Sequence, residues 1–226
     1  MALACKRTAT ASLPSGCSST LPTCGSIPRV AINRLSAARL FLFGARDAWF
    51  ALGLPLHLQA TGWSMAAVGA WLAGWTICYG LAQAAAPAAI PRSADGLSRE
   101  VPAARLLAAA LAVVPAAMAA ALASGTWDAG IVLAAGLALF GLVFAANSAV
   151  HSYLVLAYAG RDATAEDVGF YYAANAAGRL AGTMASGLLS AAGGLVACLW
   201  GSAAMLVACA LLSLALPAAR GARAGA

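Results

Sequence analysis

Six long apolar segments follow one another along this chain, and they constrain the fold more than any other feature. A bilayer core about 30 Å thick is crossed by a helix of about 20 apolar residues. Within the bilayer every backbone polar group needs a partner in the protein, which favours helices. We therefore predict an all-α integral membrane protein with six transmembrane helices. The predicted helices are residues 36–58, 65–86, 105–123, 129–158, 168–190 and 195–216.

Composition excludes a soluble domain. Of the 226 residues, 63% are hydrophobic and 9% are charged, whereas soluble domains have about 25% charged residues. The formal net charge of +6 does not indicate a nucleic-acid partner, because the basic residues are scattered singly between apolar segments and form no patch with interleaved aromatic residues. The expected surroundings are the lipid bilayer.

The two ends of the chain differ from its apolar part. Residues 1–31 have no helical periodicity and no apolar core of the kind that a secretory signal requires. We predict a disordered or non-native leader at 1–31, a transmembrane bundle at 32–217 and a cytoplasmic tail at 218–226. The leader's three cysteines have spacings that match no metal-binding motif. We therefore expect neither a metal nor a cofactor.

Basic residues mark alternate loops between the predicted helices. The loops 59–64, 124–128 and 191–194 contain no Lys or Arg. Because Lys and Arg accumulate on the cytoplasmic side of a membrane protein, both termini are predicted to be cytoplasmic. The arginines assigned to that side are Arg34, Arg39, Arg92, Arg99, Arg105, Arg161, Arg220 and Arg223.

Three ionisable residues fall near the predicted midplane, where each costs at least about 2.5 kcal/mol. Arg179 is roughly 18 Å and Arg46 roughly 15 Å into the core at 1.5 Å per residue. Two guanidinium groups at similar depth suit the oxygens of an anion. A second interpretation stays open, in which one arginine pairs with Asp47 and only joins helices. Since adjacent helical residues face different ways, Asp47 is expected to pair with Arg179 and not with Arg46.

The fifth predicted helix carries a polar stripe. Tyr172, Asn175 and Arg179 are spaced i, i+3, i+7 and share one face. The stripe either lines a substrate path or serves packing. Small residues four apart favour close helix packing. These small residues are Gly178, Gly182 and Ser186.

Asn147 and His151 form an i, i+4 pair on the fourth predicted helix. His151 either donates to an anion or relays a proton, or it satisfies a hydrogen bond between helices. With Asp47, it is a candidate for proton coupling. The full set of predicted substrate-binding residues is Arg46, Asn147, His151, Tyr172, Asn175 and Arg179.

Catalysis is not expected. The chain has no H-E-x-x-H motif, no P-loop and no dinucleotide-binding glycine fingerprint. Ser186 lies in Met184-Ala185-Ser186-Gly187, without the leading glycine of an intramembrane serine protease motif. We therefore predict a membrane transporter with no catalytic residues.

Four segments carry a resemblance to a known family. They are NRLSAARLFLFGARDAWF at 33–50, NSAVHSYLVLAYA at 147–159, VGFYYAANAAGRLAGTMASGLL at 168–189 and CLWGSA at 198–203. In these segments the chain resembles the C-terminal half of the organoarsenical-efflux permeases (ArsJ type) of the major facilitator superfamily. The resemblance implies one half of a twelve-helix bundle in a bacterial inner membrane.

The resemblance also implies a substrate and partners. The substrate would be an arseno-phosphoglycerate, made when a glyceraldehyde-3-phosphate dehydrogenase uses arsenate, and its export would confer arsenate resistance. Because such permeases have two six-helix halves around a midplane site, activity would require a separately encoded N-terminal half or a second copy of this chain. The alternative is an inert membrane fragment or an accessory subunit.

Overall fold

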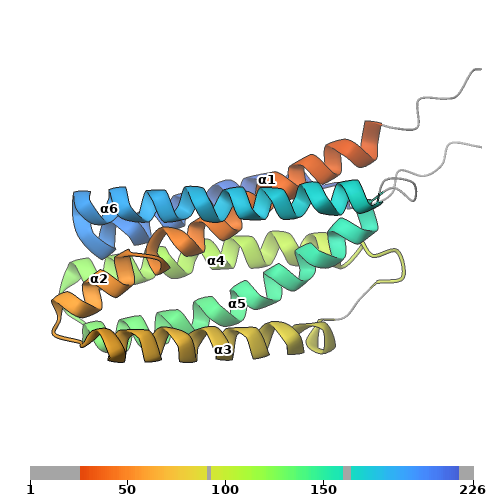
Figure 1. Ribbon diagram of the computed structural model, residues 1–226. Helices are drawn as coiled ribbons and strands as arrows, with labels where there is room; N and C mark the ends of the chain where they lie inside the picture. Colours follow the sequence, from red (N-terminus) through yellow and green to blue (C-terminus); the bar gives the residue numbers. More distant parts are fainter. Residues whose placement is uncertain (1–25, 91–92, 160–163, 219–226) are drawn as a thin grey trace, which may run out of the picture.

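The computed structural model describes residues 26–90, 93–159 and 164–218, and all regular elements in these ranges are α-helices (Figure 1). Four of them, α3 to α6, are long and apolar enough to cross a membrane. The expected all-α membrane architecture is confirmed to that extent. The helices are α1 (Ser26–Phe50), α2 (Gly53–Ala60), α3 (Met65–Ala89), α4 (Glu100–Ser124), α5 (Ala129–Tyr158) and α6 (Thr164–Leu214).

Helix α6 reverses its direction at a pair of glycines. Gly194 has φ 63° and ψ −154°, and glycine adopts this left-handed backbone at little steric cost. The chain turns back on itself there (Figure 1), and the Ser190 hydroxyl lies 3.2 Å from Cys198 Sγ on the returning part. The reversal falls where a loop between two helices is expected from the sequence. We call residues 164–192 the first limb of α6 and residues 195–214 the second limb.

The first predicted helix is in fact two helices, α1 and α2. Pro55 has no N–H, and its ring clashes with the carbonyl of the residue four positions earlier, Ala51, if the helix continues. The helix accordingly stops at Phe50 and resumes at Gly53. Ser186 Oγ accepts hydrogen bonds from the backbone N–H groups of Leu52 and Gly53, both at 3.2 Å. A side chain from the first limb of α6 therefore supplies the acceptor for the backbone N–H groups at the break between α1 and α2.

Helix α1 begins ten residues before the expected start at Ser36. Ala31, Ile32 and Leu35 are buried in an apolar cluster with α4 and α5, and this packing stabilises helix in a segment that lacks periodicity of its own. The predicted leader is thus wrong for residues 26–31. Residues 1–25 of the leader and 219–226 of the tail lie outside the described residues.

Smaller differences affect other helix ends. Helix α4 begins at Glu100, five residues earlier than expected, where the Glu100 carboxylate accepts the Ser93 N–H at 2.8 Å and the Ser93 hydroxyl. Helix α3 ends at Ala89 instead of 86, with the Ile90 N–H bonded to the Ala86 carbonyl at 3.0 Å. The two limbs of α6 extend the predicted fifth helix back to Thr164 and shorten the sixth to Leu214. The bounds of α5 are those predicted.

Glycines allow α1 and the first limb of α6 to approach closely. A Cβ atom on Gly178 would lie 2.2 Å from the Leu40 carbonyl oxygen, and one on Gly182 would lie 2.3 Å from the Gly44 carbonyl oxygen. Backbone atoms cannot move aside for such a contact as a flexible side chain can. The small residues four apart are therefore a packing face, as the sequence predicts.

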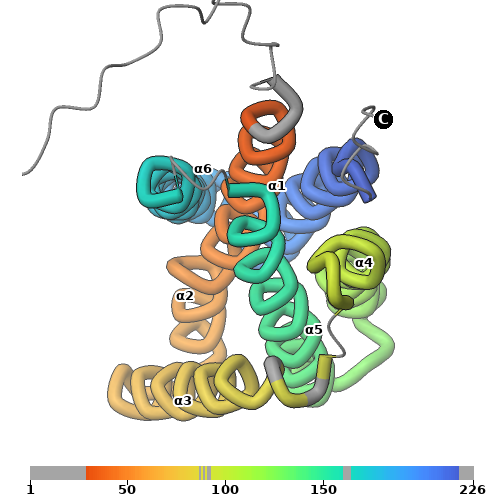
Figure 2. The backbone as a smooth tube through the Cα atoms, turned by 90° about the vertical axis from the view of Figure 1, so that its right-hand side faces the viewer, coloured from red at the N-terminus to blue at the C-terminus, as the bar shows by residue number. Residues whose placement is uncertain are grey.

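Seen along the bundle, α1 and α5 run through the middle (Figure 2). The first limb of α6 lies on one side of them, and α4 with the second limb of α6 lies on the other. Helix α3 lies at the periphery, where it packs mainly on α5. Only 6% of the residues in its most apolar stretch are buried, so α3 presents most of its surface outward.

Large apolar side chains are exposed on all sides of the bundle. In water such a surface would promote association, whereas acyl chains accept it without penalty. The surface therefore agrees with a membrane-spanning protein. The exposed residues include Ile77, Leu81, Leu106, Val113, Ile131, Leu142, Leu180, Leu188 and Leu211.

The basic residues gather at one end of the bundle, which we call the basic end. It contains the start of α1 with Arg34, the α3–α4 connection with Arg99, and the first turns of α4 with Arg105 (Figure 1). The opposite end is formed by the loops 61–64 and 125–128 and by the turn in α6, none of which contains Lys or Arg. Of the eight arginines that the sequence assigns to one side, Arg34, Arg99 and Arg105 lie at this end and Arg39 lies within α1, whereas Arg92, Arg161, Arg220 and Arg223 lie outside the described residues.

Three side chains hold the end of α6 in place at the basic end. Arg34 donates to the Ala215 carbonyl at 2.7 Å, and the Tyr158 hydroxyl donates to the Pro217 carbonyl at 2.7 Å. These donors satisfy acceptors that a helix end leaves without partners. Arg105 donates to the carbonyls of Ser213, Leu214 and Leu216 at 3.2, 3.1 and 2.6 Å.

Candidate functional site

Asp47 lies between two arginines, and we call the three residues the Asp47 triad. Arg46 Nε donates to Asp47 Oδ1 at 2.7 Å, and Arg179 Nε donates to Asp47 Oδ2 at 3.0 Å. The pairing with Arg179 confirms the expectation from the sequence. The expectation that Arg46 does not pair with Asp47 is wrong, because the Nε atom lies far out on a flexible side chain that reaches the neighbouring carboxylate despite the different Cβ directions.

The triad keeps donors for a ligand. Each arginine uses its Nε on Asp47, and the terminal amino groups of both make no hydrogen bond to any described residue. The Arg179 side chain is 58% exposed, whereas the side chains of Arg46 and Asp47 are 13% and 7% exposed. A guanidinium fork binds two oxygens of a carboxylate or phosphate at once. The triad can therefore accept an oxyanion from the exposed side of Arg179.

Arg39 is a third arginine inside the bundle, and the sequence prediction misplaced it. It was grouped with the arginines of the cytoplasmic side although position 39 falls inside the predicted helix 36–58, and in the structure it lies within α1 and is 3% exposed. Its Nη1 donates to the Ser148 carbonyl at 3.2 Å and to the Ser148 Oγ at 3.0 Å. Gln83 Nε2 donates to the same hydroxyl at 3.3 Å. Among the described residues Arg39 has no carboxylate partner.

One phenyl ring joins Arg39 to the triad. The guanidinium carbon of Arg39 lies 4.1 Å from the Phe43 ring centroid, and that of Arg46 lies 5.3 Å from it. The face of an aromatic ring attracts cations, so Phe43 replaces part of the hydration that both arginines lose. Phe43 also packs edge-on against Phe144 of α5 at 5.0 Å. The spacing of Arg39, Phe43 and Arg46, i, i+4, i+7, is the sequence signal that would have found Arg39.

Asn147 and His151 lie one turn apart on α5, on either side of Ser148, the residue to which Arg39 donates. Both are 0% exposed, and their side-chain nitrogens and the Asn147 amide oxygen have no hydrogen-bond partner among the described residues. Arg39 faces Ser148 across the α1–α5 contact, one residue from Asn147. His151 lies three residues beyond Ser148, one turn further along the same face of α5. The predicted site residues thus divide into two groups along α1.

The predicted stripe on α6 is only partly directed inward. Tyr172 is 53% exposed, and its ring meets that of Tyr171 at 5.5 Å. Tyr171, which the sequence prediction did not include, is fully buried, with its ring 5.0 Å from the Arg39 guanidinium carbon. Asn175 lies one turn before Arg179, and its amide oxygen is buried without a partner in the described chain.

Charge at these positions is unbalanced. Arg39, Arg46 and Arg179 carry three positive charges, and Asp47 is the one acidic residue that pairs with any of them in the described ranges. No group of three His, Cys, Asp or Glu residues that could hold a metal occurs among the described residues. Anion binding therefore suits this charge distribution better than cation binding.

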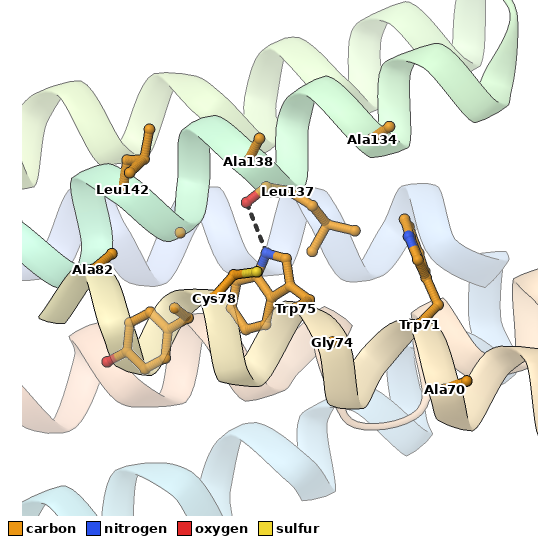
Figure 3. Close-up of a pocket in the computed structure, with 12 residues that line it drawn as sticks. Ala70, Trp71, Gly74, Trp75, Cys78, Ala82, Ala134, Leu137, Ala138 and Leu142 are labelled. Atoms are coloured by element: carbon orange, nitrogen blue, oxygen red, sulfur yellow. Dashed lines mark hydrogen bonds between the residues drawn. The ribbon is translucent and has the colours of Figure 1, made fainter.

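A separate groove lies between α3 and α5, and its chemistry is different (Figure 3). It has a volume of about 520 Å³ and is lined by Ala, Gly, Leu and aromatic side chains with Cys78. Trp75 stacks on Tyr79 at 5.5 Å and donates its Nε1–H to the Leu137 carbonyl at 2.9 Å. No charged side chain lines the groove, so the anion-binding residues lie elsewhere.

Comparisons with known proteins do not assign this chain to a family. They give no evidence for the resemblance to the organoarsenical permeases, so the case for a function depends on the residues and their geometry. Searches against protein-family models, curated proteins and solved structures find no significant match to the chain.

Proposed function

We propose that the chain is one six-helix half of a membrane permease that exports an anionic solute. The observation that carries this proposal is the excess of three arginines over Asp47 within apolar helices. A charge in the membrane interior is costly unless it has a partner, and such residues usually mark a substrate path. An anionic solute supplies the missing negative charge while it is bound.

The proposed substrate is an organic oxyanion of the arseno-phosphoglycerate type, and its export confers arsenate resistance. Guanidinium groups bind phosphate and arsenate oxygens through paired N–H donors. The choice of an arsenical among organic oxyanions is carried over from the sequence expectation for residues 33–50, 147–159 and 168–189. A glyceraldehyde-3-phosphate dehydrogenase that accepts arsenate would supply the substrate.

Six membrane spans follow if α1 with α2 forms one broken span and each limb of α6 forms another. An even number of spans puts both ends of the chain on one side of the membrane. The basic end is then cytoplasmic by the distribution of arginines. In this arrangement the protein is a multi-pass protein of a bacterial inner membrane.

A second six-helix unit is proposed to complete the site, either a separately encoded N-terminal half or a second copy of this chain. Two features support it: Arg179 is 58% exposed and its amino groups have no partner among the described residues, and α3 presents most of its surface outward. The alternative is an inert fragment or an accessory subunit. That alternative leaves the three arginines unexplained.

The test is arsenate resistance in an arsenic-sensitive bacterium that expresses the chain with a glyceraldehyde-3-phosphate dehydrogenase. Strains with and without a matching N-terminal half are compared. Resistance that needs the added half supports a split permease, and resistance without it supports a homodimer. No resistance in either strain, despite expression in the membrane, supports the inert fragment.

A matched pair of variants tests the role of the triad. Arg179→Ala removes a guanidinium from the triad, whereas Arg99→Ala removes the same charge from the exposed α3–α4 connection. Export is expected to fall at least tenfold in the first variant and to stay near wild type in the second. Equal export in both variants would contradict anion binding by Arg179.

Export is further proposed to be coupled to protons, with Asp47 as the better candidate carrier. A proton on its carboxylate would weaken both arginine bonds at once. His151 has no hydrogen-bond partner within the described residues through which a proton could pass. Uptake of the substrate into inverted vesicles is measured with and without an uncoupler, and uptake that is insensitive to the uncoupler would exclude both residues.

A further inference from the structure

Arg39 and its neighbours on α5 combine two features that the triad does not share. Arg39 is a buried cation without a carboxylate partner in the described ranges, whereas the triad contains Asp47. Asn147 and His151 beside it are completely buried, with all four side-chain polar atoms lacking partners among the described residues. We call these three residues the Arg39 pocket.

Buried polar groups are normally hydrogen-bonded, and buried charges are normally paired. The Arg39 pocket departs from both rules at one place. Ser148 and the ring of Phe43 stabilise the guanidinium, but neither carries negative charge. The missing hydrogen bonds and counter-charge therefore raise the free energy of the folded state without a ligand. A ligand that supplies acceptors and negative charge would lower it.

Little in the protein's own sequence can supply the negative charge that Arg39 lacks. The nearest acidic side chain on α1, Asp47, has one carboxylate oxygen bonded to Arg46 and the other to Arg179. Residues 1–25 contain no Asp or Glu. A solute is therefore the better source of the missing charge.

The register between α1 and α5 places a further donor at the same level. Arg39 bonds Ser148, and four residues further along α1 Phe43 packs on Phe144, four residues back along α5. Continuing this antiparallel register toward the basic end puts Ser36 opposite His151. Ser36 is 1% exposed, and its hydroxyl also has no partner in the described structure.

We propose that the Arg39 pocket is a second anion site, which binds a small tetrahedral oxyanion such as phosphate or arsenate. The guanidinium, the Asn147 amide N–H, one ring N–H of a neutral His151 and the Ser36 hydroxyl are its donors. The pocket is closed to solvent in this conformation, so the anion binds when α5 moves away from α1 and favours that open state. The site extends the proposed export function, but its occupancy is measured without transport.

The experiment uses the full chain in detergent and follows its thermal unfolding midpoint against phosphate and arsenate, with chloride at equal ionic strength as the reference. A ligand that binds only the folded state raises the midpoint with concentration. We expect this rise in the wild type and in Arg99→Gln, and a clearly smaller rise in Arg39→Gln. No rise in the wild type, or an equal rise in Arg39→Gln, overturns the proposal.

Arg179→Gln separates the two anion sites. If it loses the phosphate-dependent rise as fully as Arg39→Gln does, one joint site replaces the two sites proposed here. If it keeps the rise but abolishes export, both proposals stand. If export does not depend on Arg179 while phosphate binding depends on Arg39, only the proposed function fails.

Asn147→Leu keeps the size of the side chain and removes its hydrogen-bonding groups, so it remains informative if Arg39→Gln does not fold. In the absence of anions its midpoint is expected to rise, because an unsatisfied polar group leaves the core. If Asn147 has only a structural role, this higher midpoint is the only change expected. The anion site predicts in addition a smaller phosphate-dependent rise, and an undiminished rise overturns the role of Asn147.

Discussion

Arg179 on the first limb of α6 donates its Nε–H to Oδ2 of Asp47 on α1 at 3.0 Å, while Arg46 occupies the other carboxylate oxygen at 2.7 Å. The Asp47 carboxylate thus joins α1 to the first limb of α6. Each of the two arginines donates to it through its own Nε. The amino groups of both arginines stay available. The ion pair and the proposed anion site are therefore parts of one arrangement.

Asp47→Asn is expected to destabilise the protein, because two cations stay close together without their counter-ion. The loss of unfolding free energy should be about 2 kcal/mol, below the ~3–5 kcal/mol typical of a broken buried pair, since water screens the exposed Arg179. Thermal unfolding in detergent measures the change. Adding Arg179→Gln should restore part of the loss as a coupled pair, and purely additive losses would contradict the pairing.

Gly178→Ala is expected to force α1 and the first limb of α6 apart. The new methyl group would lie 2.2 Å from the Leu40 carbonyl oxygen, and overpacking of this kind costs about 1–3 kcal/mol. Gly169→Ala on the same limb is the control, since no atom lies within 4 Å of its added carbon. That control should gain up to ~1 kcal/mol from helix propensity. Equal unfolding midpoints for the two variants would exclude the close helix contact.

Asp95 is expected to make stability depend on acid pH. The Ser98 hydroxyl and the N–H groups of Ser98 and Leu97 hold the pKa of the exposed Asp95 carboxyl below its usual value. Because the folded-state pKa is the lower one, the contribution is fully present above the unfolded pKa of about 3.9 and is lost as pH falls through the folded pKa. Asp95→Asn should therefore be less stable than wild type near neutral pH.

The same comparison at lower pH provides the check on Asp95. The difference in unfolding midpoint between wild type and Asp95→Asn should shrink as the pH is lowered below about 4, where the Asp95 carboxylate of the unfolded chain begins to take up its proton while the folded one stays ionised. A difference that stays constant from neutral pH to below this value would show that the charge of Asp95 does not contribute.

The proposed topology predicts opposite accessibility for two loops. In a variant without the native cysteines, Thr126→Cys at the α4–α5 connection should react with a membrane-impermeant thiol reagent added to intact cells. Arg99→Cys at the basic end should react only in inverted vesicles. Reaction of both positions from the same side would exclude the six-span arrangement.

Much of the helical architecture could be predicted from the sequence because apolar length and breaker residues are local signals. The turn at Gly193 and Gly194 and the bounds of α5 fall where composition places them. The start of α1 could not be predicted in this way. Ala31, Ile32 and Leu35 near its start are buried against α4 and α5, which is a tertiary effect without a periodic signature.

The candidate site was only partly predictable for the same reason. The pairing of Asp47 with Arg179 followed from the cost of a charge in the membrane, and the structure contains it. The bond from Arg46 did not follow, because spacing rules describe Cβ directions and not the reach of a long side chain. Arg39 was grouped with the arginines of the cytoplasmic side although it falls inside the predicted helix 36–58, and this grouping concealed the third arginine of the bundle.

The contacts around the end of α6 determine the order in which the bundle can be completed during synthesis. Arg34 and Arg105 bond to carbonyls of residues 213–216, and Tyr158 bonds to the carbonyl of Pro217. These acceptors leave the ribosome after the helices that carry the donors have all been made. Arg34 is therefore synthesised more than 180 residues before its partner. Until the end of α6 is made, α1, α4 and α5 lack the hydrogen bonds that join them to it.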